Sequence, residues 1–396
     1  MERAARLNLR VVGLVCGLSG LLGWAFYVAT FSREPSQDWM VYYTAARAYF
    51  DGNLSLIFDG NRFTAVLNER FADWLSWPLP LHPWLYPPHF LLLLLPFGML
   101  PFAAAEAVFL LATFACLVAA SWYLAESAER RWLHGLSLLL CPAAAITVCL
   151  GQNAFVTSAL LLGGLGLLPR RPLLAGALLG VLTYKPQLWL MVPVALIAAR
   201  QWRALAAAAA TALLLTLASL ALFGAEAWRT WLALMLEPSE LYQDWLIQGR
   251  LNGQSVYACA ALLGASPALA NAIQAAAAIG AGLAVYWSYR RAMPEELRVA
   301  IVLAATVLAA PHLIGYDAIM LAVAATLLLS RALADGFRFG DSILIMLVWL
   351  SPLANPPSVF RLGLMTPLVI ALFIACVIAR ARGRGAAAAA PSLSPA

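Results

Sequence analysis

Three ionisable side chains stand apart in this chain because they border or interrupt apolar segments. Asp38 follows the first apolar run, Lys185 is the only lysine and lies inside another, and His312 follows a proline between two more. A carboxylate can accept the proton of a hydroxyl group, and an ammonium or imidazolium group can stabilise an anion such as a phosphate. These residues therefore predict a general base that works beside an anion-binding group.

Each of these side chains also has a purely structural interpretation. Asp38 could cap the helix that begins after it, because Asp is a preferred residue at helix starts. Lys185 could extend its ammonium group to the membrane surface and so avoid the cost of a charge inside the bilayer, about 2.5–3.5 kcal/mol. His312 could be an internally satisfied histidine. The sequence leaves both interpretations open for each residue.

Other polar residues accompany these three in loops or at helix ends: Tyr42, Gln152, Arg250, Gln254 and Asp317. The sequence contains no zinc-ligand spacing, P-loop, dinucleotide-binding glycine pattern or nucleophile elbow. Its six cysteines have neither metal-ligand nor disulfide spacing. The pattern therefore argues against soluble nucleotide chemistry and against a metal centre.

The composition indicates which elements must position these residues. The chain has 396 residues, of which 63% are hydrophobic and 11% are charged, whereas soluble domains have about 45–50% apolar and about 25% charged residues. The formal net charge is +6, but the arginines lie in short runs between apolar segments, as orientation signals do. The sequence therefore predicts a membrane protein rather than a nucleic-acid-binding one.

Apolar runs of about 20 residues predict transmembrane helices, because backbone inside a bilayer must pair its own polar groups. Basic loops stay on the cytoplasmic side, and this rule orients each run. The ranges that satisfy it, with both chain ends in the cytoplasm, are 11–31, 103–125, 132–149, 153–168, 172–184, 187–199, 204–223, 267–289, 297–311, 313–330, 341–354 and 359–380. We therefore expect an all-α polytopic bundle of about twelve transmembrane helices, in one domain formed by residues 1–381.

Two stretches are irregular. Residues 87–99 are apolar but short and broken by proline, and a full span there would move Arg130 and Arg131 to the outside. We predict that they form a short helix that dips into the outer leaflet, where protein or a water-filled cavity covers it. Residues 172–199 carry Lys185 midway between arginines at both ends, and we predict a tight hairpin with its tip outward.

The outer face receives the two long loops of this topology, residues 32–101 and 224–266, whereas the cytoplasmic links are short and basic. We expect membrane-parallel helices in the first loop, which begins with an aromatic-rich stretch after Asp38 that is typical of a membrane interface. Residues 382–396 are rich in Ala, Gly, Pro and Ser and predict a disordered cytoplasmic tail. Functional groups are therefore expected at the outer face.

Several short motifs occur in order along the chain: Asp38-Trp-Met-Val-Tyr-Tyr-Thr-Ala-Ala46, Tyr86-Pro-Pro88, Leu150-Gly-Gln152, Tyr184-Lys-Pro186, Gln254-Ser255, Pro311-His312 and Tyr316-Asp317. In this order, and on one side of the membrane, they resemble glycosyltransferase family 87, the polyprenyl-phosphate-mannose-dependent type. The resemblance extends from Asp38 to about Ala318, which is most of the chain.

The resemblance implies a GT-C fold, with many helices and a catalytic acid in a long first outer loop. It implies a polyprenyl-phosphate-linked donor, a hexose that is mannose at the family level, and a lipid or glycan acceptor at the outer face of a bacterial inner membrane. In this scheme Asp38 is the general base of a direct, inverting displacement. The scheme requires no cofactor and no metal.

The same scheme assigns supporting roles. The leaving phosphate needs positive charge nearby, and Lys185 is the first candidate for it, with Arg250 more distant. His312 would either stabilise that phosphate or assist the acceptor. The residues expected to bind sugar or acceptor are Tyr42, Gln152, Gln254 and Asp317.

Two other functions fit a polytopic chain. A transporter or lipid flippase commonly has this many spans, but it usually has related halves and binding residues near the midplane. Here no halves match, and the polar residues gather at one face. A noncatalytic scaffold for envelope assembly has no positive feature in its favour. The sequence therefore predicts a membrane glycosyltransferase, with a lipid or sugar transporter as the alternative.

Overall fold

The computed structural model describes residues 2–31, 36–125, 127–236, 247–356 and 358–388. Every regular element in these ranges is a helix, which confirms the predicted all-α class. In chain order the helices are α1 (Glu2–Phe31), α2 (Gln37–Phe50), η1 (Leu54–Phe58), α3 (Gly60–Arg70), α4 (Pro88–Gly98), α5 (Phe102–Tyr123), α6 (Ala128–Leu140), α7 (Pro142–Leu150), α8 (Ala154–Leu167), α9 (Pro172–Val181), η2 (Leu182–Tyr184), α10 (Pro186–Trp189), α11 (Met191–Ala198), α12 (Trp202–Leu236), α14 (Val256–Leu262), α15 (Pro267–Tyr289), α16 (Glu295–Ala309), α17 (Ile319–Asp335), α18 (Asp341–Leu350), η3 (Ser351–Ala354), η4 (Arg361–Met365) and α19 (Thr366–Ala388).

Several of these helices can cross a bilayer. Within the described residues, five are long and apolar enough to do so: Arg6–Phe31, Phe102–Tyr123, Trp202–Leu236, Pro267–Tyr289 and Arg361–Arg382. The pair α6 and α7 is a sixth candidate, bent by 53°. The chain is therefore a multi-pass membrane protein, but the predicted number of about twelve spans is not confirmed, because the remaining apolar helices are shorter than a full span.

Prolines and glycines explain why apolar runs became short or broken helices. Pro142 begins α7 directly after α6, and Pro186 begins α10 directly after η2. Gly224 interrupts α12 with a φ of 80°, a conformation that glycine adopts without strain. Proline removes a backbone donor and breaks a continuing helix. Each predicted span therefore contains a helix, but several contain two short ones.

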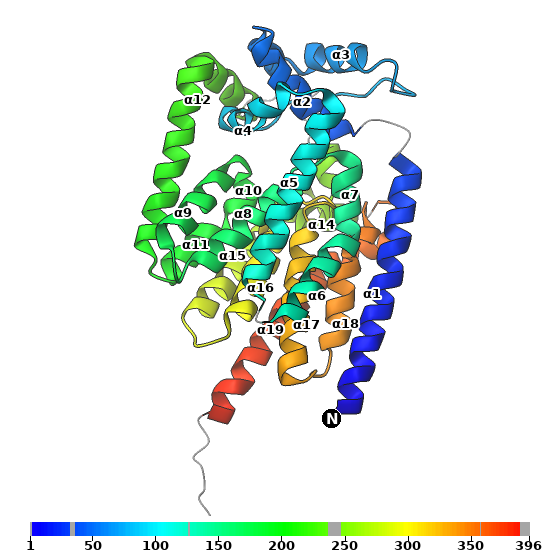
Figure 1. The fold of residues 1–396 in the computed structure, drawn as a ribbon, viewed down its shortest axis with the longest axis vertical. Coiled ribbons are helices and arrows are strands. Elements are labelled where there is room, and N and C mark those ends of the chain that lie inside the picture. Colours follow the sequence, from blue (N-terminus) through cyan, green and yellow to red (C-terminus); the bar gives the residue numbers. More distant parts are fainter. Residues whose placement is uncertain (1, 32–35, 126, 237–246, 357, 389–396) are drawn as a thin grey trace, which may run out of the picture.

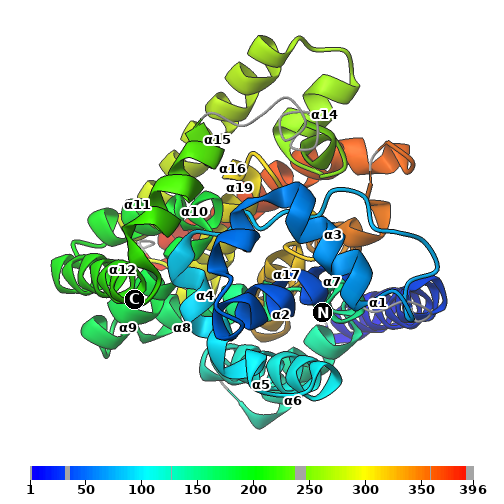
Figure 2. The same ribbon diagram turned by 90° about the horizontal axis from the view of Figure 1, so that it is seen from above.

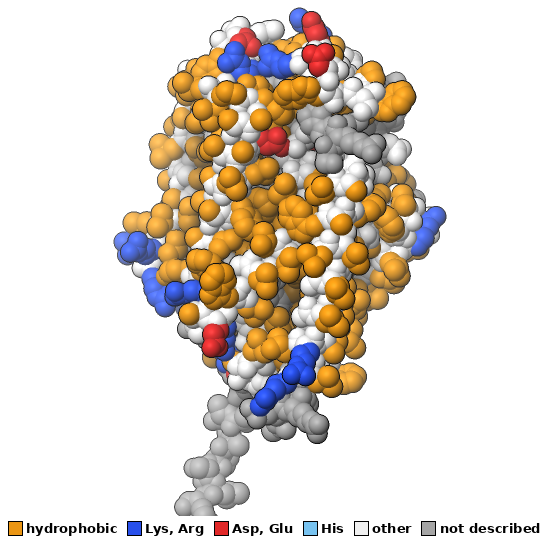
Figure 3. Space-filling view, turned by 45° about the vertical axis from the view of Figure 1, so that its right-hand side comes forward, with side chains coloured by type: hydrophobic (Ala, Val, Ile, Leu, Met, Phe, Trp, Pro, Cys, Tyr) orange, Lys and Arg blue, Asp and Glu red, His pale blue; other side chains and the backbone are white. Residues whose placement is uncertain are grey.

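The centre of the bundle is formed by helices that are apolar all round. Nearly every residue of α16 and α17 is buried, as expected for a helix enclosed by others. The outer helices, by contrast, expose leucines and other large apolar side chains. Figure 3 shows an apolar band on one face of the molecule, with charged side chains mainly toward the two ends. Such a surface suits the hydrocarbon of a bilayer.

The two chain ends lie on the same side of the bundle. Figure 1 places the start of α1 and the end of α19 together, at the end away from α2 and α3. An even number of crossings, with both ends of the chain in the cytoplasm, stays a prediction. α19 continues to Ala388 and so enters the predicted tail of residues 382–396; residues 389–396 lie outside the described residues, as do 32–35 and 237–246 of the two predicted outer loops.

The first loop forms a helical cap at the opposite end. α2, α3 and α4 lie over the ends of the bundle helices (Figures 1 and 2) and enclose a hydrophobic cluster of their own. The aromatic residues of α2 were expected at the membrane interface, but Trp39 and Tyr42 are buried in this cluster. The loop is long enough to bury its aromatic surface internally. α4, the segment expected to dip into the bilayer, packs against α2 in the cap.

α12 connects the bundle to this cap. Beyond the break at Gly224, the indole Nε1 of Trp231 donates to the backbone oxygen of Leu85, 3.1 Å away. The ring of Trp228 stacks on His89 of α4, with the ring centroids 5.8 Å apart. A segment more than a hundred residues later in the chain therefore completes the packing of the first loop.

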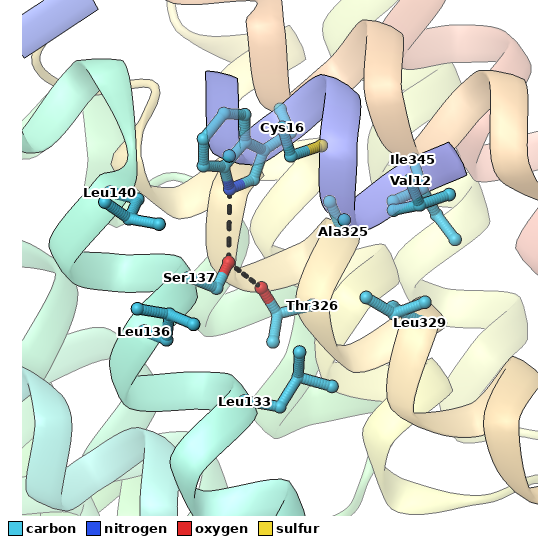
Figure 4. Close-up of a pocket in the computed structure, with 13 residues that line it drawn as sticks. Val12, Cys16, Leu133, Leu136, Ser137, Leu140, Ala325, Thr326, Leu329 and Ile345 are labelled. Atoms are coloured by element: carbon cyan, nitrogen blue, oxygen red, sulfur yellow. Dashed lines mark hydrogen bonds between the residues drawn. The ribbon is translucent and has the colours of Figure 1, made fainter. Parts of the chain in front are cut away.

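A hollow separates α1 from α6, α17 and α18 (Figure 4). α1 packs closely at Gly20, where an added Cβ would overlap the backbone of Leu140, but it diverges at Gly17, which has open space. The polar groups in the hollow satisfy one another. The indole Nε1 of Trp349 donates to Ser137 Oγ at 3.1 Å, and that oxygen lies 2.6 Å from Thr326 Oγ1. The hollow therefore presents only an apolar surface to other molecules.

A buried ion pair joins the last two long helices. Asp341 at the start of α18 accepts a hydrogen bond from Arg380 of α19, and both side chains are almost fully buried. Arg380 also donates to the backbone oxygen of Gly336 at 2.7 Å. The arginine was predicted as an orientation signal at a cytoplasmic loop, and it also fastens the α17–α18 turn to α19.

This ion pair predicts a large effect of removing one partner. Asp341→Ala leaves the buried Arg380 charge with only the Asp335 carboxylate, 4.0 Å away. Removing one partner of a buried ion pair costs about 3–5 kcal/mol in comparable cases. We expect a clearly lower melting temperature for the purified variant in detergent. The matched control is Glu226→Ala, since the Glu226–Arg229 pair is exposed and such pairs contribute about 0–1 kcal/mol. Equal melting temperatures for the two variants would contradict the assignment.

Candidate active site

Asp38 lies in the first turn of α2, where the dipole of the helix favours a negative charge. The N-cap of α2 is Ser36, so the alternative interpretation of Asp38 as the cap is wrong. Asp38 keeps part of its surface exposed, whereas Trp39 and Met40 after it are fully buried. The buried face of α2 therefore holds a partly exposed Asp38 in place.

Gly151 brings the end of α7 against the start of α2. Its φ is 66°, in the left-handed region, and a Cβ at this position would overlap that of Trp39. Glycine is required on both counts, because any side chain would strain the backbone and push the two helices apart. The close approach places the next residue, Gln152, beside Asp38.

Two tyrosines orient the Gln152 amide. The Tyr42 hydroxyl donates to Gln152 Oε1 at 2.9 Å, and the backbone N–H of Asn153 donates to the same oxygen at 3.0 Å. The hydroxyl oxygens of Tyr42 and Tyr86 lie 2.8 Å apart. With its oxygen occupied in this way, the amide directs its N–H₂ group to the Asp38 carboxylate, with which it hydrogen-bonds.

Lys185 and Asp317 form a buried ion pair. Lys185 Nζ lies 2.9 Å from Asp317 Oδ1, and each side chain is only 4% exposed. The ammonium also lies 5.4 Å from the ring centroid of Tyr316, within the range of a cation–π interaction. This burial rules out the interpretation in which Lys185 extends to the membrane surface, whereas the outward-pointing hairpin of residues 172–199 stays a prediction. The Asp317 carboxylate, from the α16–α17 connection, offsets the free-energy cost of burying the Lys185 charge.

The groups around Asp38 act on its proton affinity in opposite directions. Burial raises the pKa of Asp38 above its ordinary value, and the negative charge of Asp317 adds to this effect. A hydrogen bond from Gln152 and electrostatic interactions with Lys185 and His82 lower it by less. A carboxylate with a raised pKa is a stronger base, better matched to accepting a proton near neutral pH.

His312 belongs to the same electrostatic cluster. Burial lowers the pKa of His312, Asp317 opposes this shift, and the charges of Lys185 and Arg250 reinforce it. The imidazole is therefore neutral at pH 7, so it can donate and accept hydrogen bonds but supplies no positive charge. The structure thus brings His312, Lys185, Asp317 and Asp38 into one group of interacting charges and dipoles.

Two residues predicted for the site are engaged elsewhere. Arg250 donates to Asn271 Oδ1 at 3.2 Å, and its guanidinium lies 3.5 Å from the ring centroid of Tyr257. The side-chain nitrogen of Gln254 donates to the backbone oxygen of Ser351 at 2.9 Å and to Thr366 Oγ1 at 3.2 Å. Both side chains hold the α14 region against its neighbours.

The structure adds three residues that were not among the predicted site residues. Tyr86 hydrogen-bonds to Tyr42, Tyr316 lies against Lys185, and the charge of His82 acts on Asp38. Tyr86 and Tyr316 belong to motifs that carried the family resemblance, which is a signal for both. His82 lies in a proline-rich stretch of the first loop, and no pattern in the sequence distinguishes it.

The described residues contain no group of three or more His, Cys, Asp and Glu side chains placed to hold a metal ion. Asp38 and the polar groups around it comprise instead two carboxylates, one ammonium, imidazoles, phenol hydroxyls and an amide. Such a set can take a proton from a hydroxyl group and offer positive charge to an anion.

Comparison with known proteins gives one match. Residues 84–311 match the family model of glycosyltransferase family 87, which is more than half of the chain. The matched range contains Tyr86, Gln152 and Lys185, whereas Asp38 precedes it and His312 follows it directly. No curated protein and no solved structure matches the chain.

The raised pKa of Asp38 predicts that this carboxylate lowers stability. A folded protein with a raised acid pKa holds the proton more tightly than the unfolded chain does, so ionisation of Asp38 destabilises the fold above that pKa. We expect Asp38→Asn to raise the melting temperature at pH 7, and the gain to disappear as the pH falls below the folded pKa.

The matched control for this measurement is Asp51→Asn at the other end of α2. Asp51 pairs with Arg47 at the surface, 2.9 Å away, so its removal should give no gain at any pH. A melting temperature of Asp38→Asn below that of the wild type at pH 7 would show that the carboxylate stabilises the fold.

Proposed function

The chain belongs to glycosyltransferase family 87, and on this premise we propose that it transfers a hexose from a polyprenyl-phosphate-linked donor to a hydroxyl group of a lipid or glycan acceptor. Family membership and the apolar helices make it a membrane glycosyltransferase. We propose three further properties: the polyprenyl-phosphate donor class, mannose as the first sugar to test, and inversion at the anomeric carbon. The observation that carries it is Asp38, which is partly exposed, hydrogen-bonded by Gln152 and under the electrostatic influence of Lys185.

The proposed reaction is a single displacement. The acceptor hydroxyl gives its proton to the Asp38 carboxylate while its oxygen bonds to the anomeric carbon of the donor sugar. The bond between that carbon and the phosphate oxygen breaks, and the polyprenyl phosphate leaves with the electron pair. Attack and departure on opposite sides of the carbon invert its configuration. Asp38 then releases its proton to water.

The environment of Asp38 suits this step. Burial raises its pKa, so the carboxylate binds the proton of the acceptor more readily than an exposed aspartate would. The hydrogen bond from Gln152 keeps the carboxylate in one orientation, and Tyr42 keeps the amide in place. The acceptor therefore meets a base that is already aligned.

The leaving phosphate needs positive charge rather than a strong acid. A phosphate monoester has a second pKa of about 6, so it departs without being fully protonated. Lys185 has three N–H donors, and one of them bonds to Asp317. We propose that the others face the phosphate, and that Asp317 holds the ammonium in position for it.

The remaining residues have narrower roles in this proposal. His312 is neutral because burial lowers its pKa, so we assign it to hydrogen bonding with the acceptor rather than to charge stabilisation. Tyr42 and Gln152 border the sugar. Gln254 has an indirect role, because its side chain holds the backbone of Ser351 in position. Arg250 is a distant cation, and its positive charge helps to keep His312 neutral by lowering the pKa of that imidazole.

The positive-inside rule gives the side of the membrane on which the reaction occurs. α2, which carries Asp38, lies in the cap at the end of the bundle away from both chain ends (Figure 1). The arginine runs between apolar segments favour the cytoplasm for the end with the chain termini. We therefore propose that the active site faces the outer side of a bacterial inner membrane.

The first test is the activity of Asp38→Asn in proteoliposomes supplied with polyprenyl-phosphate mannose and acceptor. We expect transfer to fall by about 10²–10⁴-fold, the usual contribution of a general base, while donor binding persists. Asp51→Asn on the same helix should retain full activity. Normal turnover in Asp38→Asn would remove Asp38 from the mechanism, and lipid movement without a new glycosidic product would favour a flippase.

The second test separates structure from function in the Lys185–Asp317 pair. Lys185→Met alone leaves a buried carboxylate without its counter-charge and should cost about 3–5 kcal/mol of stability. The double variant Lys185→Met/Asp317→Asn removes both charges and should regain most of that stability but remain inactive. If the double variant transferred sugar at the wild-type rate, the pair would be structural only.

A further inference from the structure

A groove runs along the bundle between α15 and α19, on the surface of α16. α16 packs against both of these helices, and the residues that line the groove come from all three, namely Ala277, Gly280, Ala281, Ala284, Leu308 and Ile374. Its walls are almost entirely apolar. Since α15 and α19 are long enough to cross the bilayer, the groove opens to hydrocarbon.

The groove is shaped by small side chains. The residues of α15 that face it are alanines and glycine, and a Cβ at Gly280 would meet no other atom within 4 Å. The volume of the groove is about 400 Å³. On the α15 side, the protein therefore leaves this space open rather than filling it with large side chains.

α15, the α15–α16 connection and α19 form a basic pocket, at the end of the bundle where α1 begins and α19 ends (Figure 1). The pocket has a volume of about 470 Å³ and is lined by Trp287, Arg291, Ala292, Ala381 and Arg382. The guanidinium of Arg382 lies 5.2 Å from the ring centroid of Trp287. Tryptophan is typical of the membrane interface, so the pocket lies at the depth of lipid headgroups.

The charge of this pocket is not neutralised locally. Arg298 donates to the backbone oxygens of Ser288 and Arg291, each at 3.3 Å, and Arg380 pairs with Asp341. Neither Arg291 nor Arg382 forms an ion pair with a described carboxylate. Two exposed guanidinium groups therefore face the pocket with donors to offer an anion.

The groove and the pocket lie along one face of each helix. On α15, the lining residues Ala277, Gly280, Ala284 and Trp287 follow each other at intervals of three or four, which places them on the same side of the helix. Arg291 lies just after the last residue of α15, Tyr289. On α19, Ile374 lines the groove and Arg382 lines the pocket about two turns later. One continuous surface therefore changes from apolar inside the bilayer to basic at its edge.

We propose that this surface is a binding site for one anionic phospholipid of the surrounding bilayer. The headgroup phosphate binds between Arg291 and Arg382, beside the Trp287 ring, and an acyl chain lies in the groove between α15 and α19. A basic pocket between membrane helices on the cytoplasmic side recognises anionic headgroups in this way. The site lies at the end of the molecule opposite Asp38 and is independent of the proposed reaction.

The test is native mass spectrometry of the full-length protein in detergent, titrated with phosphatidylglycerol or phosphatidylcholine of the same acyl chains. We expect preferential binding of phosphatidylglycerol, weakened about tenfold or more in Arg291→Gln/Arg382→Gln, since each basic residue near a membrane surface contributes about 1 kcal/mol. The control is Arg131→Gln/Arg203→Gln, which removes the same charge from other exposed arginines and should leave binding unchanged.

A second variant tests the acyl chain. Gly280→Leu fills open space in the groove and replaces glycine by a better helix former, so the protein should fold normally and bind phosphatidylglycerol at least about tenfold more weakly. Glycerol phosphate should not compete with the lipid, which separates a lipid site from a free phosphate site. The proposal would be overturned if the protein bound both lipids equally, or if the control pair lost as much affinity as the test pair. Unchanged binding in either test variant, or competition by glycerol phosphate, would also overturn it.

Discussion

The ion pair between Lys185 and Asp317 is the interaction on which the geometry around Asp38 depends. It joins two connections that lie far apart in the chain, one before α10 and one before α17. Attraction between charges is strong in a buried environment, but either charge alone would be costly there. The pair therefore fixes the two connections relative to each other, and the charge of the Lys185 ammonium acts electrostatically on Asp38.

The second requirement is that α2 and α7 meet at Gly151. The chain provides the functional residues at interruptions of its helices: Gln152 after the end of α7, Lys185 between η2 and α10, and Asp317 before α17. Helix ends leave backbone groups and side chains free of the regular hydrogen-bond pattern. In a bundle of apolar helices, these interruptions are where polar side chains can converge without exposing a charge to lipid.

The sequence was sufficient to find most of this cluster but not its arrangement. Asp38, Lys185, His312, Asp317, Gln152 and Tyr42 were recognisable because polar residues at the ends of apolar runs are conspicuous. The burial of Lys185 was not predictable, because its partner is distant in the chain. His82 was also missed, because no pattern in the sequence around it distinguishes this histidine. The span count was not recovered, since an apolar run looks alike whether it is one long helix or two short ones, as in α6 and α7.

The contact of α12 with the cap has a consequence for the order in which the protein is assembled. The helices of the cap leave the ribosome well before Trp228 and Trp231 do, because more than a hundred residues separate them. At a synthesis rate of about 5–20 residues per second, this delay is on the order of ten seconds. During that interval Trp228 and Trp231 do not yet cover the aromatic surface of α4. The nascent chain therefore exposes this surface to chaperones at the membrane.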